Sequence, residues 1–149
     1  MAKTVGSMDR EILHKEIDLI QGVINRMANN SFLVKGWTIA IIVAVLALTR
    51  DNLNSDDLTY LVLILIIPLM VFWYLDAFFL HKERCFIELY NWVIINREKS
   101  NEKLCDLNYR RFKDEVDSIG MIMLSSTLIT FYGIVSLALI VIFIYNTLQ

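Results

Sequence analysis

Three long apolar stretches constrain this chain more than any other feature of its sequence. They cover residues 31–49, 58–80 and 120–145. Each is close to the 20 or so mostly apolar residues that a helix needs to cross about 30 Å of hydrocarbon. A segment inside lipid must pair its own backbone N–H and C=O groups, which a helix does. Hydrophobic residues make up 56% of the chain. The sequence therefore predicts an all-α integral membrane protein, a bundle of three spans with cytoplasmic amphipathic helices.

The distribution of lysine and arginine predicts how these spans are oriented. Residues 1–35 contain five of these cations and residues 81–113 contain eight, whereas the loop 50–57 contains only Arg50 beside three aspartates. Cytoplasmic flanks of membrane spans collect Lys and Arg. We therefore expect the N-terminus inside and the C-terminus outside. The expected segments are a cytoplasmic amphipathic helix (1–30), the first span (31–49), an external loop (50–57), the second span (58–80), a cytoplasmic helical segment (81–119), the third span (120–145) and an external tail (146–149).

The cytoplasmic segments carry apolar residues with helical spacing. One set, Leu13, Ile17, Ile20, Ile24, Met27 and Ser31, follows steps of four and three, which is typical of one face of an amphipathic helix. This helix either lies on the membrane surface or packs against other helices. A second set continues the helix of the second span: Phe86, Leu89 and Val93. The same rhythm runs from Phe112 to Ile140, so we expect one continuous helix over about 108–145.

Two charged residues interrupt the apolar stretches at matching depths. Lys35 lies four residues after Ser31, where the first span begins, and Asp76 lies four residues before Leu80, where the second ends. Because the two spans run in opposite directions, both charges lie about 6 Å below the cytoplasmic interface. Pairing reduces the cost of a charge in hydrocarbon. The sequence favours an intramembrane ion pair between Lys35 and Asp76. In the alternatives, Lys35 reaches the headgroups beside a boundary Asp76, or Asp76 faces a pore or handles protons.

The third apolar stretch has two unlike sides. We assign Ser125, Ser126, Thr130, Tyr132, Gly133 and Ser136 to a polar half, and Leu124, Leu128, Phe131, Val135, Ala138 and Ile142 to a lipid-facing half. Small and hydroxylated residues permit close helix contact, or line a narrow aqueous path. Three spans are few for enclosing a path within one chain. We therefore expect a cyclic homo-oligomer, with a tetramer as the first estimate, whose pore is lined by Ser126, Thr130, Gly133 and Ser136. Packing within a monomeric bundle is the alternative.

Basic and aromatic residues are interleaved after the second span. The cations are Arg97, Lys99, Lys103, Arg110, Arg111 and Lys113. Tyr109 and Phe112 lie between them in NYRRFK, a combination that can hold lipid headgroups or an anionic ligand such as an oligonucleotide. Four acids, Glu102, Asp106, Asp114 and Glu115, weaken this pattern. A solvated face that keeps the segment in the cytoplasm is the alternative.

Sequence signatures of catalysis and of bound metals are missing. No HExxH, GxSxG or Gly-rich phosphate loop occurs, and His14 and His81 lie outside the expected spans. Cys85 and Cys105 have no CxxC or Cys/His pattern around them, which favours plain reduced thiols. We therefore expect no enzyme activity, no cofactor and no metal ion.

Two segments carry a more specific pattern, LIQGVINRMANNSFLVKGW at 19–37 and PLMVFWYLDAFFLHKERCFIELY at 68–90. They resemble a family of small bacterial membrane proteins in antiphage defence operons, in which, as in the Hailong system, a membrane channel effector is paired with a nucleotidyltransferase. The matching residues of the first segment are Arg26, Met27, Asn30, Ser31, Phe32, Lys35, Gly36 and Trp37. Those of the second are Pro68, Phe72, Trp73, Leu75, Asp76, Leu80, Glu83, Arg84, Phe86, Leu89 and Tyr90. Residues 98–149 carry no comparable match.

The resemblance implies an oligomeric channel in the bacterial inner membrane. Membership of this family implies that a nucleic-acid-type ligand controls the channel, that its activity damages the host membrane, and that a nucleotidyltransferase is encoded alongside. The alternative from another class is a non-conducting membrane scaffold or anchor, whose cytoplasmic helices bind a partner protein.

Overall fold

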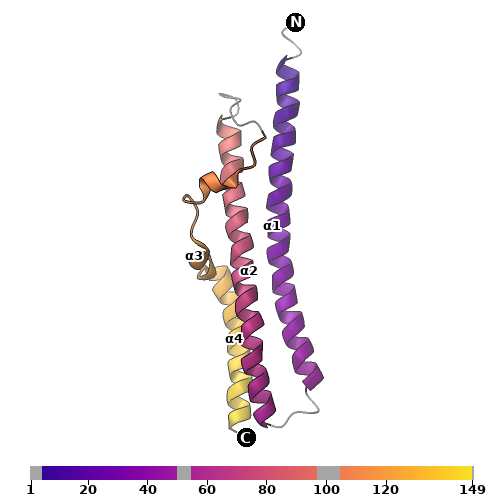
Figure 1. Ribbon diagram of the computed structural model, residues 1–149, viewed down its shortest axis with the longest axis vertical. Coiled ribbons are helices and arrows are strands. Elements are labelled where there is room, and N and C mark those ends of the chain that lie inside the picture. The colour runs from indigo at the N-terminus through magenta and orange to yellow at the C-terminus, as the bar shows by residue number, and fades with distance from the viewer. Residues whose placement is uncertain (1–4, 50–54, 97–104, 149) are drawn as a thin grey trace.

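The structure, a computed structural model, describes residues 5–49, 55–96 and 105–148 (Figure 1). Its elements are α1 (Val5–Thr49), α2 (Ser55–Asn96), the short 3-10 helix η1 (Tyr109–Phe112), α3 (Ile119–Met123) and α4 (Ser126–Thr147). Every regular element in these ranges is a helix, as the sequence predicts.

The helices α1 and α2 form a long antiparallel hairpin (Figure 1). They contain 45 and 42 residues, so at 1.5 Å per residue they are about 68 and 63 Å long, roughly twice the thickness of a bilayer core. The expected amphipathic helix is the N-terminal part of α1. It packs against α2 with its apolar face, where Ile20 is fully buried and Leu13, Ile17 and Ile24 are partly buried. The alternative in which the helix packs against another helix is thus the one that the structure contains.

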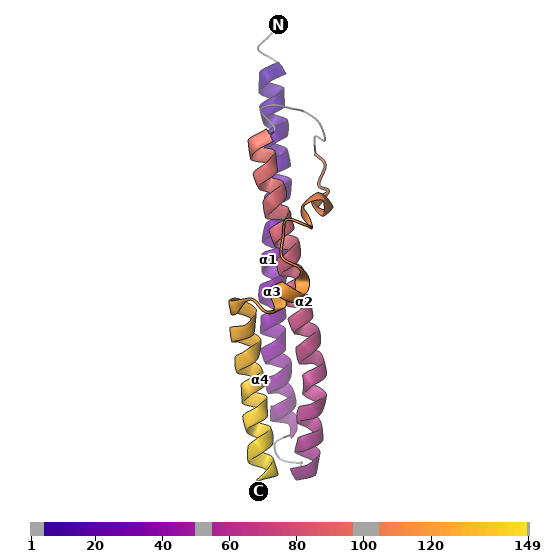
Figure 2. The same cartoon turned by 90° about the vertical axis from the view of Figure 1, so that its left-hand side faces the viewer.

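The helix α4 lies beside only one half of the hairpin (Figures 1 and 2). Its 22 residues make it about 33 Å long, which is close to the thickness of a bilayer core. The other half of the hairpin extends beyond the start of α4. Three helices are long and apolar enough to cross a membrane, in the segments Arg10–Leu48, Tyr60–Asn96 and Ser126–Tyr145. They contain most of the three apolar stretches of the sequence.

Two clusters of buried apolar side chains hold these helices together. The larger cluster joins α2 to α1, α3 and α4, and its buried members are Ile42, Val62, Leu65, Leu69, Ala77, Ile122, Leu128, Tyr132 and Leu139. The smaller cluster lies in the half of the hairpin that extends beyond α4, and its buried members are Ile20, Phe86, Leu89, Val93 and Phe112. Residues 105–123, which we call the collar, pack along α2 through both clusters. Phe86, Leu89 and Val93 share one face of α2, as predicted.

The expectation of one continuous helix over 108–145 is wrong. The chain forms η1, an irregular stretch, α3 and then α4, because two serines start new helices. Ser118 has an extended backbone, and its hydroxyl accepts a hydrogen bond from the backbone N–H of Met121. Ser125 is also extended, with ψ of 150°, directly after the end of α3. The apolar rhythm that we followed from Phe112 therefore crosses two interruptions.

These interruptions change which side of the chain faces α2. Before them, Phe112 is buried, and Val116, Ile119 and Met123 are partly buried. After them, the residues that continue the same spacing, including Thr130, are exposed. The spacing that we followed from Phe112 to Ile140 in the sequence therefore describes two different faces. One ends and the other begins at Leu124 and Ser125.

Candidate functional site

A buried ion pair joins α1 to α2. The ammonium Nζ of Lys35 lies 2.6 Å from the carboxylate Oδ2 of Asp76. Asp76 is fully buried, whereas 21% of the Lys35 side chain is exposed. The structure therefore brings together the two charges that the sequence placed at one depth. The carboxylate lies inside the bundle, and the ammonium lies closer to its surface.

The second oxygen of Asp76 also has a partner. Ser31, one turn before Lys35 on α1, donates its hydroxyl to Asp76 Oδ1 at 2.5 Å, and Lys35 Nζ donates to Ser31 Oγ at 2.9 Å. Ser31, Lys35 and Asp76 thus form a closed triangle of charge-assisted hydrogen bonds. Such bonds are shorter and stronger than bonds between neutral groups.

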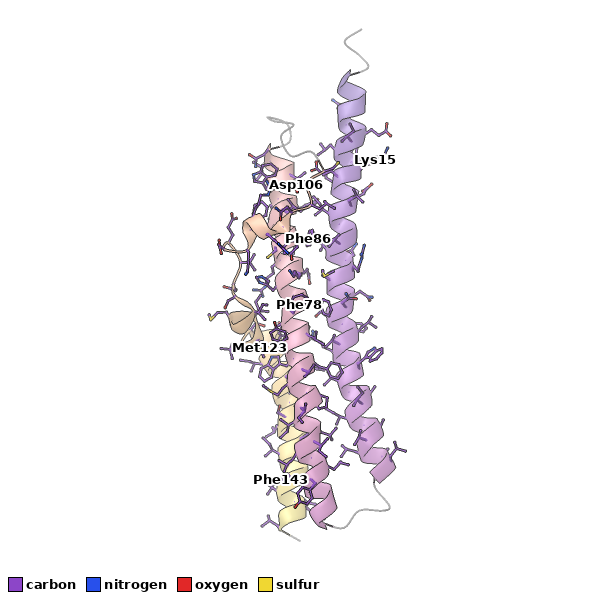
Figure 3. All side chains as sticks on the ribbon, in the orientation of Figure 1. Lys15, Phe78, Phe86, Asp106, Met123 and Phe143 are labelled. Carbon is purple, nitrogen blue, oxygen red and sulfur yellow. The ribbon has the colours of Figure 1, made fainter. Side chains whose placement is uncertain are left out.

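Tyr132 connects this triangle to α4. Its hydroxyl lies 3.2 Å from Asp76 Oδ2 and 3.2 Å from the carbonyl oxygen of Phe72, and the residue is fully buried. The ring of Tyr132 stacks on Trp73, with centroids 5.6 Å apart and planes within 8°. Trp73 in turn donates its indole N–H to the carbonyl oxygen of Met123, at the end of α3 (Figure 3). One polar network therefore contacts α1, α2, α3 and α4.

The arrangement fits a junction between helices better than a catalytic centre. Both oxygens of Asp76 accept hydrogen bonds, so the cost of burying the carboxylate is compensated by several partners. A fully satisfied buried network specifies one arrangement of the helices around it. Thr38, also buried, donates to the carbonyl oxygen of Val34 one turn earlier on α1. In the part of the chain that the structure describes, no group of three or more His, Cys, Asp or Glu residues is placed to hold a metal ion.

Removal of the Tyr132 hydroxyl tests the link to α4. Tyr132→Phe keeps the stacking on Trp73 but deletes the donor to Asp76, and hydrogen bonds to charged groups contribute about 1.5–3 kcal/mol. We expect a free energy of unfolding lower by about 2 kcal/mol, measured by thermal and denaturant unfolding in detergent micelles. Tyr60→Phe, at an exposed position of α2, is the matched control and should change little. Equal stability of both variants would contradict the role given to this hydroxyl.

The residues expected to line a pore do not face the interior of the chain. Ser126, Thr130 and Gly133 lie on the exposed side of α4, and Ser136 is partly buried. Ser136 lines an apolar groove of about 330 Å³ between α2 and α4. The first three therefore share one outward face, while Ser136 lies at its edge.

Most of the half of the third span that we expected to face lipid packs against the other helices instead. Leu128 is fully buried, and three more of its residues are partly buried against the larger cluster: Phe131, Val135 and Ile142. Tyr132, assigned to the same half as Thr130, is buried on the opposite side. At 100° per residue, Tyr132 follows Thr130 by 200° around the helix, so the two cannot share a face. Leu128 and Tyr132, four residues apart, share the buried one.

The structure describes three of the six cations that were predicted to form an anion-binding cluster. Arg97, Lys99 and Lys103 lie outside the described residues. Arg110 and Lys113 are exposed. Arg111 instead packs its guanidinium on aromatic rings, 4.9 Å from the centroid of Trp92 and 5.5 Å from that of Phe112. Its Nη2 atom is buried without a hydrogen-bond partner among the described residues. Arg111 therefore contributes to collar packing, and the described candidates for anion binding are Arg110 and Lys113.

Lys82, on α2, makes a second cation contact with the collar. Its ammonium lies 4.1 Å from the ring centroid of Tyr109 and 5.2 Å from that of Phe78, and it donates a hydrogen bond to the Tyr109 hydroxyl. This hydrogen bond lowers the pKa of Tyr109. The side chain of Glu16 accepts a hydrogen bond from the backbone N–H of Cys105 at 3.0 Å, which attaches the start of the collar to α1. Sequence reasoning missed these contacts because they join residues far apart in the chain.

Sequence reasoning also missed Ser31 and Tyr132 as partners of the charge pair. Ser31 lies one turn before Lys35, so helical spacing alone was a usable signal. Tyr132 is a hydroxyl group in an otherwise apolar stretch, and its position relative to Leu128 was the signal for the buried side. Comparisons with known proteins found no matching family model, curated protein or solved structure.

Proposed function

We propose that this protein is the channel-forming subunit of an oligomer in the bacterial inner membrane, where it acts as an effector of antiphage defence. In this proposal a nucleic-acid-type ligand acts on the cytoplasmic part, a nucleotidyltransferase is encoded alongside, and ion flow damages the host membrane. The proposal rests on the family resemblance, on the three apolar helices and on the exposed face of α4.

The lengths of the helices support one position in the bilayer. From Tyr60 to His81 the helix α2 rises about 31 Å, which matches the hydrocarbon thickness. Exposed Tyr60 and Tyr145 lie toward the ends of α2 and α4 that are remote from the collar, where aromatic residues favour the interface. The Lys35–Asp76 pair then lies just inside the opposite interface. The part of the collar before α3 lies in the cytoplasm, and α3 lies at the interface. This orientation agrees with the distribution of Lys and Arg.

The outward face of α4 is the observation that carries the proposal. Ser126, Thr130 and Gly133 are exposed on a helix whose other residues are mostly large and apolar. Hydroxyls and a glycine gain little from contact with lipid tails, whereas they suit close helix contact or water. Several copies of the chain arranged around an axis would place this face against a neighbouring helix or against water. We take four copies as the first estimate.

Much of the surface of the three apolar helices is also available for contact with other copies. In the most apolar 18 residues of each segment, 17%, 28% and 17% of the residues are buried. A single chain thus leaves most of these residues to lipid or to neighbouring subunits.

Ion flux through reconstituted protein tests the proposal. Purified chain in liposomes should release a potassium gradient, measured with a potassium-selective electrode, and crosslinking in the same liposomes should give species larger than a monomer. Empty liposomes are the control. Assembled protein that releases no potassium either with or without added oligonucleotides would contradict channel activity. Oligonucleotides of different length and composition, added at the face that exposes the collar, should change the flux if the ligand is of nucleic-acid type.

A scaffold function is the second candidate, and the cytoplasmic half of the hairpin favours it. This half is a packed unit of its own, with Ile20, Leu89 and Val93 fully or almost fully buried. Such a rigid projection suits the binding of a partner protein. A chain that assembles, conducts no ions and retains a specific protein from the source bacterium would support the scaffold.

A further inference from the structure

An open cavity with both polar and apolar walls lies where the collar passes over α2. Its volume is about 480 Å³, and it is lined by His81, Lys113, Asp114, Val116, Ser118 and Ile119. The lining comes from α2 on one side and from the chain between η1 and α3 on the other. Neither the ion pair of Lys35 and Asp76 nor the outward face of α4 includes any of these residues.

The walls of this cavity are held in place by Asp117. The imidazole Nδ1 of His81 lies 3.0 Å from the carbonyl oxygen of Asp117, and Arg84 Nη1 donates to Asp117 Oδ2 at 2.9 Å. His81 is 4% exposed, so its imidazole is packed between α2 and the collar. Ser118 caps α3 with its oxygen, which leaves its hydroxyl proton available for another acceptor. A preorganised cavity loses less entropy when a ligand binds.

Two opposite charges lie at the cavity. Lys113 and Asp114 are both exposed, and among the described residues neither belongs to an ion pair. A ligand that carries only an anion would meet repulsion from Asp114, and one that carries only a cation would meet repulsion from Lys113. The cavity therefore suits a ligand with one negative and one positive group a few bonds apart.

In the membrane position proposed above, the cavity lies at the depth of the lipid headgroups, which favours a lipid as its ligand. With Tyr60 at the outer interface, His81 lies about 31 Å away along α2, at the depth of the cytoplasmic headgroups. Met121 and Leu124, which follow the cavity along the chain, are 62% and 63% exposed. Large apolar side chains at this depth offer contact to acyl chains.

We propose that the cavity binds the headgroup of a phospholipid with a primary ammonium, of the phosphoethanolamine type. The phosphate lies beside Lys113 and the hydroxyl of Ser118, the ammonium lies beside Asp114, and the acyl chains follow Met121 and Leu124. A primary ammonium donates hydrogen bonds to a carboxylate, whereas a quaternary ammonium has no N–H group. The site rests on the proposed membrane insertion and does not depend on ion conduction.

Lipid binding to detergent-purified protein, followed by native mass spectrometry, tests this site. Phosphatidylethanolamine, phosphatidylcholine and phosphatidylglycerol with identical acyl chains are titrated separately. We expect the ethanolamine lipid to bind tightest, and Lys113→Gln and Asp114→Asn each to weaken it about fivefold, the upper end of what an exposed ion pair contributes. Lys15→Gln and Asp18→Asn change exposed charges on α1 and should leave binding unchanged. Lys15 lies far from the collar (Figure 3), and Asp18 is less than one helical turn after it.

Three outcomes would overturn the proposal. Equal binding of the ethanolamine and choline lipids would remove the role of Asp114 as an acceptor. A preference for phosphatidylglycerol that Asp114→Asn strengthens would indicate a site for anionic lipid. Displacement of the lipid by an equal concentration of soluble glycerophosphoethanolamine would show that the bilayer is not the source of the ligand. Ethanolamine-lipid binding by a protein that conducts no ions would support the site and reject the channel, so the two proposals fail separately.

Discussion

Replacing Asp76 by asparagine is expected to destabilise the folded chain by about 3–5 kcal/mol, because it leaves the ammonium of Lys35 without its counter-charge. The change keeps the shape of the side chain, but it turns one carboxylate oxygen into an NH2 group. Ser31 and Tyr132 donate to different oxygens of Asp76, so one of them also loses its acceptor. The loss therefore reports the charge together with one hydrogen bond. Thermal and denaturant unfolding in micelles, followed by circular dichroism, measures it.

The reverse change should cost more. Lys35→Met leaves the carboxylate of Asp76 without its counter-charge, and Asp76 is fully buried whereas Lys35 is partly exposed. The double variant Lys35→Met with Asp76→Leu should recover most of the stability, since well-packed apolar residues often replace a buried ion pair without loss. Glu11→Gln is the control, because it breaks an ion pair with Lys15 in which both side chains are about 70% exposed, and it should leave the unfolding temperature unchanged.

Additive losses would contradict this account. If the double variant is as unstable as the sum of the two single changes, Lys35 and Asp76 do not act as a pair. A small loss for each single variant would show that both groups are solvated in the folded chain.

The position of this pair could be predicted because it depends only on counting residues along two straight helices. Lys35 and Asp76 each lie four residues from the end of an apolar stretch, and opposite directions bring equal counts to equal depth. The helices themselves could be predicted for a similar reason. The length of an apolar stretch and the spacing of apolar residues within one helix, such as Leu89 and Val93, are local properties of the sequence.

The collar could not be predicted because its structure depends on two local interruptions. A serine inside an apolar rhythm is compatible with a helix, and only the extended backbone at Ser118 and Ser125 shows that new helices start there. Once the helix is divided, the side that is buried before Leu124 does not determine which side is buried after it. The buried side of α4 therefore had to come from the structure, where Leu128 and Tyr132 identify it.

The contacts of the collar with α1 and α2 could not be predicted from the sequence for another reason. Arg111 was an equal member of a cluster of six cations in the sequence, but stacking on Trp92 gives it a structural role. Trp92 lies 19 residues earlier, on another element, and its spacing from Arg111 carries no signal. A basic residue among aromatic residues can thus be part of the packing as easily as part of a ligand site.

The outward face of α4 gives the last prediction, which concerns conduction. Gly133→Leu and Thr130→Leu should each reduce the potassium flux of reconstituted protein about tenfold, because bulky apolar side chains narrow or dewet a path lined by this face. At Gly133 an added Cβ would meet no atom within 4 Å, and Thr130 is exposed. Because both positions are exposed, we expect neither change to disturb the packing of a single chain. An effect on flux would then arise in the path between subunits or in the contacts between them.

The control for this experiment must be chosen from the structure. Leu128 was expected to tolerate change but is fully buried, so its replacement would damage the core. Ala138→Leu makes the same kind of enlargement at an exposed position that lies about 80° around α4 from Thr130, and it should conduct like the parent protein. Crosslinking of each variant separates a narrowed path from failed assembly. Parent-like flux through assembled Gly133→Leu and Thr130→Leu oligomers would exclude α4 as the pore-lining helix. Flux lost equally in Ala138→Leu would mean that any enlargement of α4 disturbs contacts between subunits, because the effect would then be independent of the face.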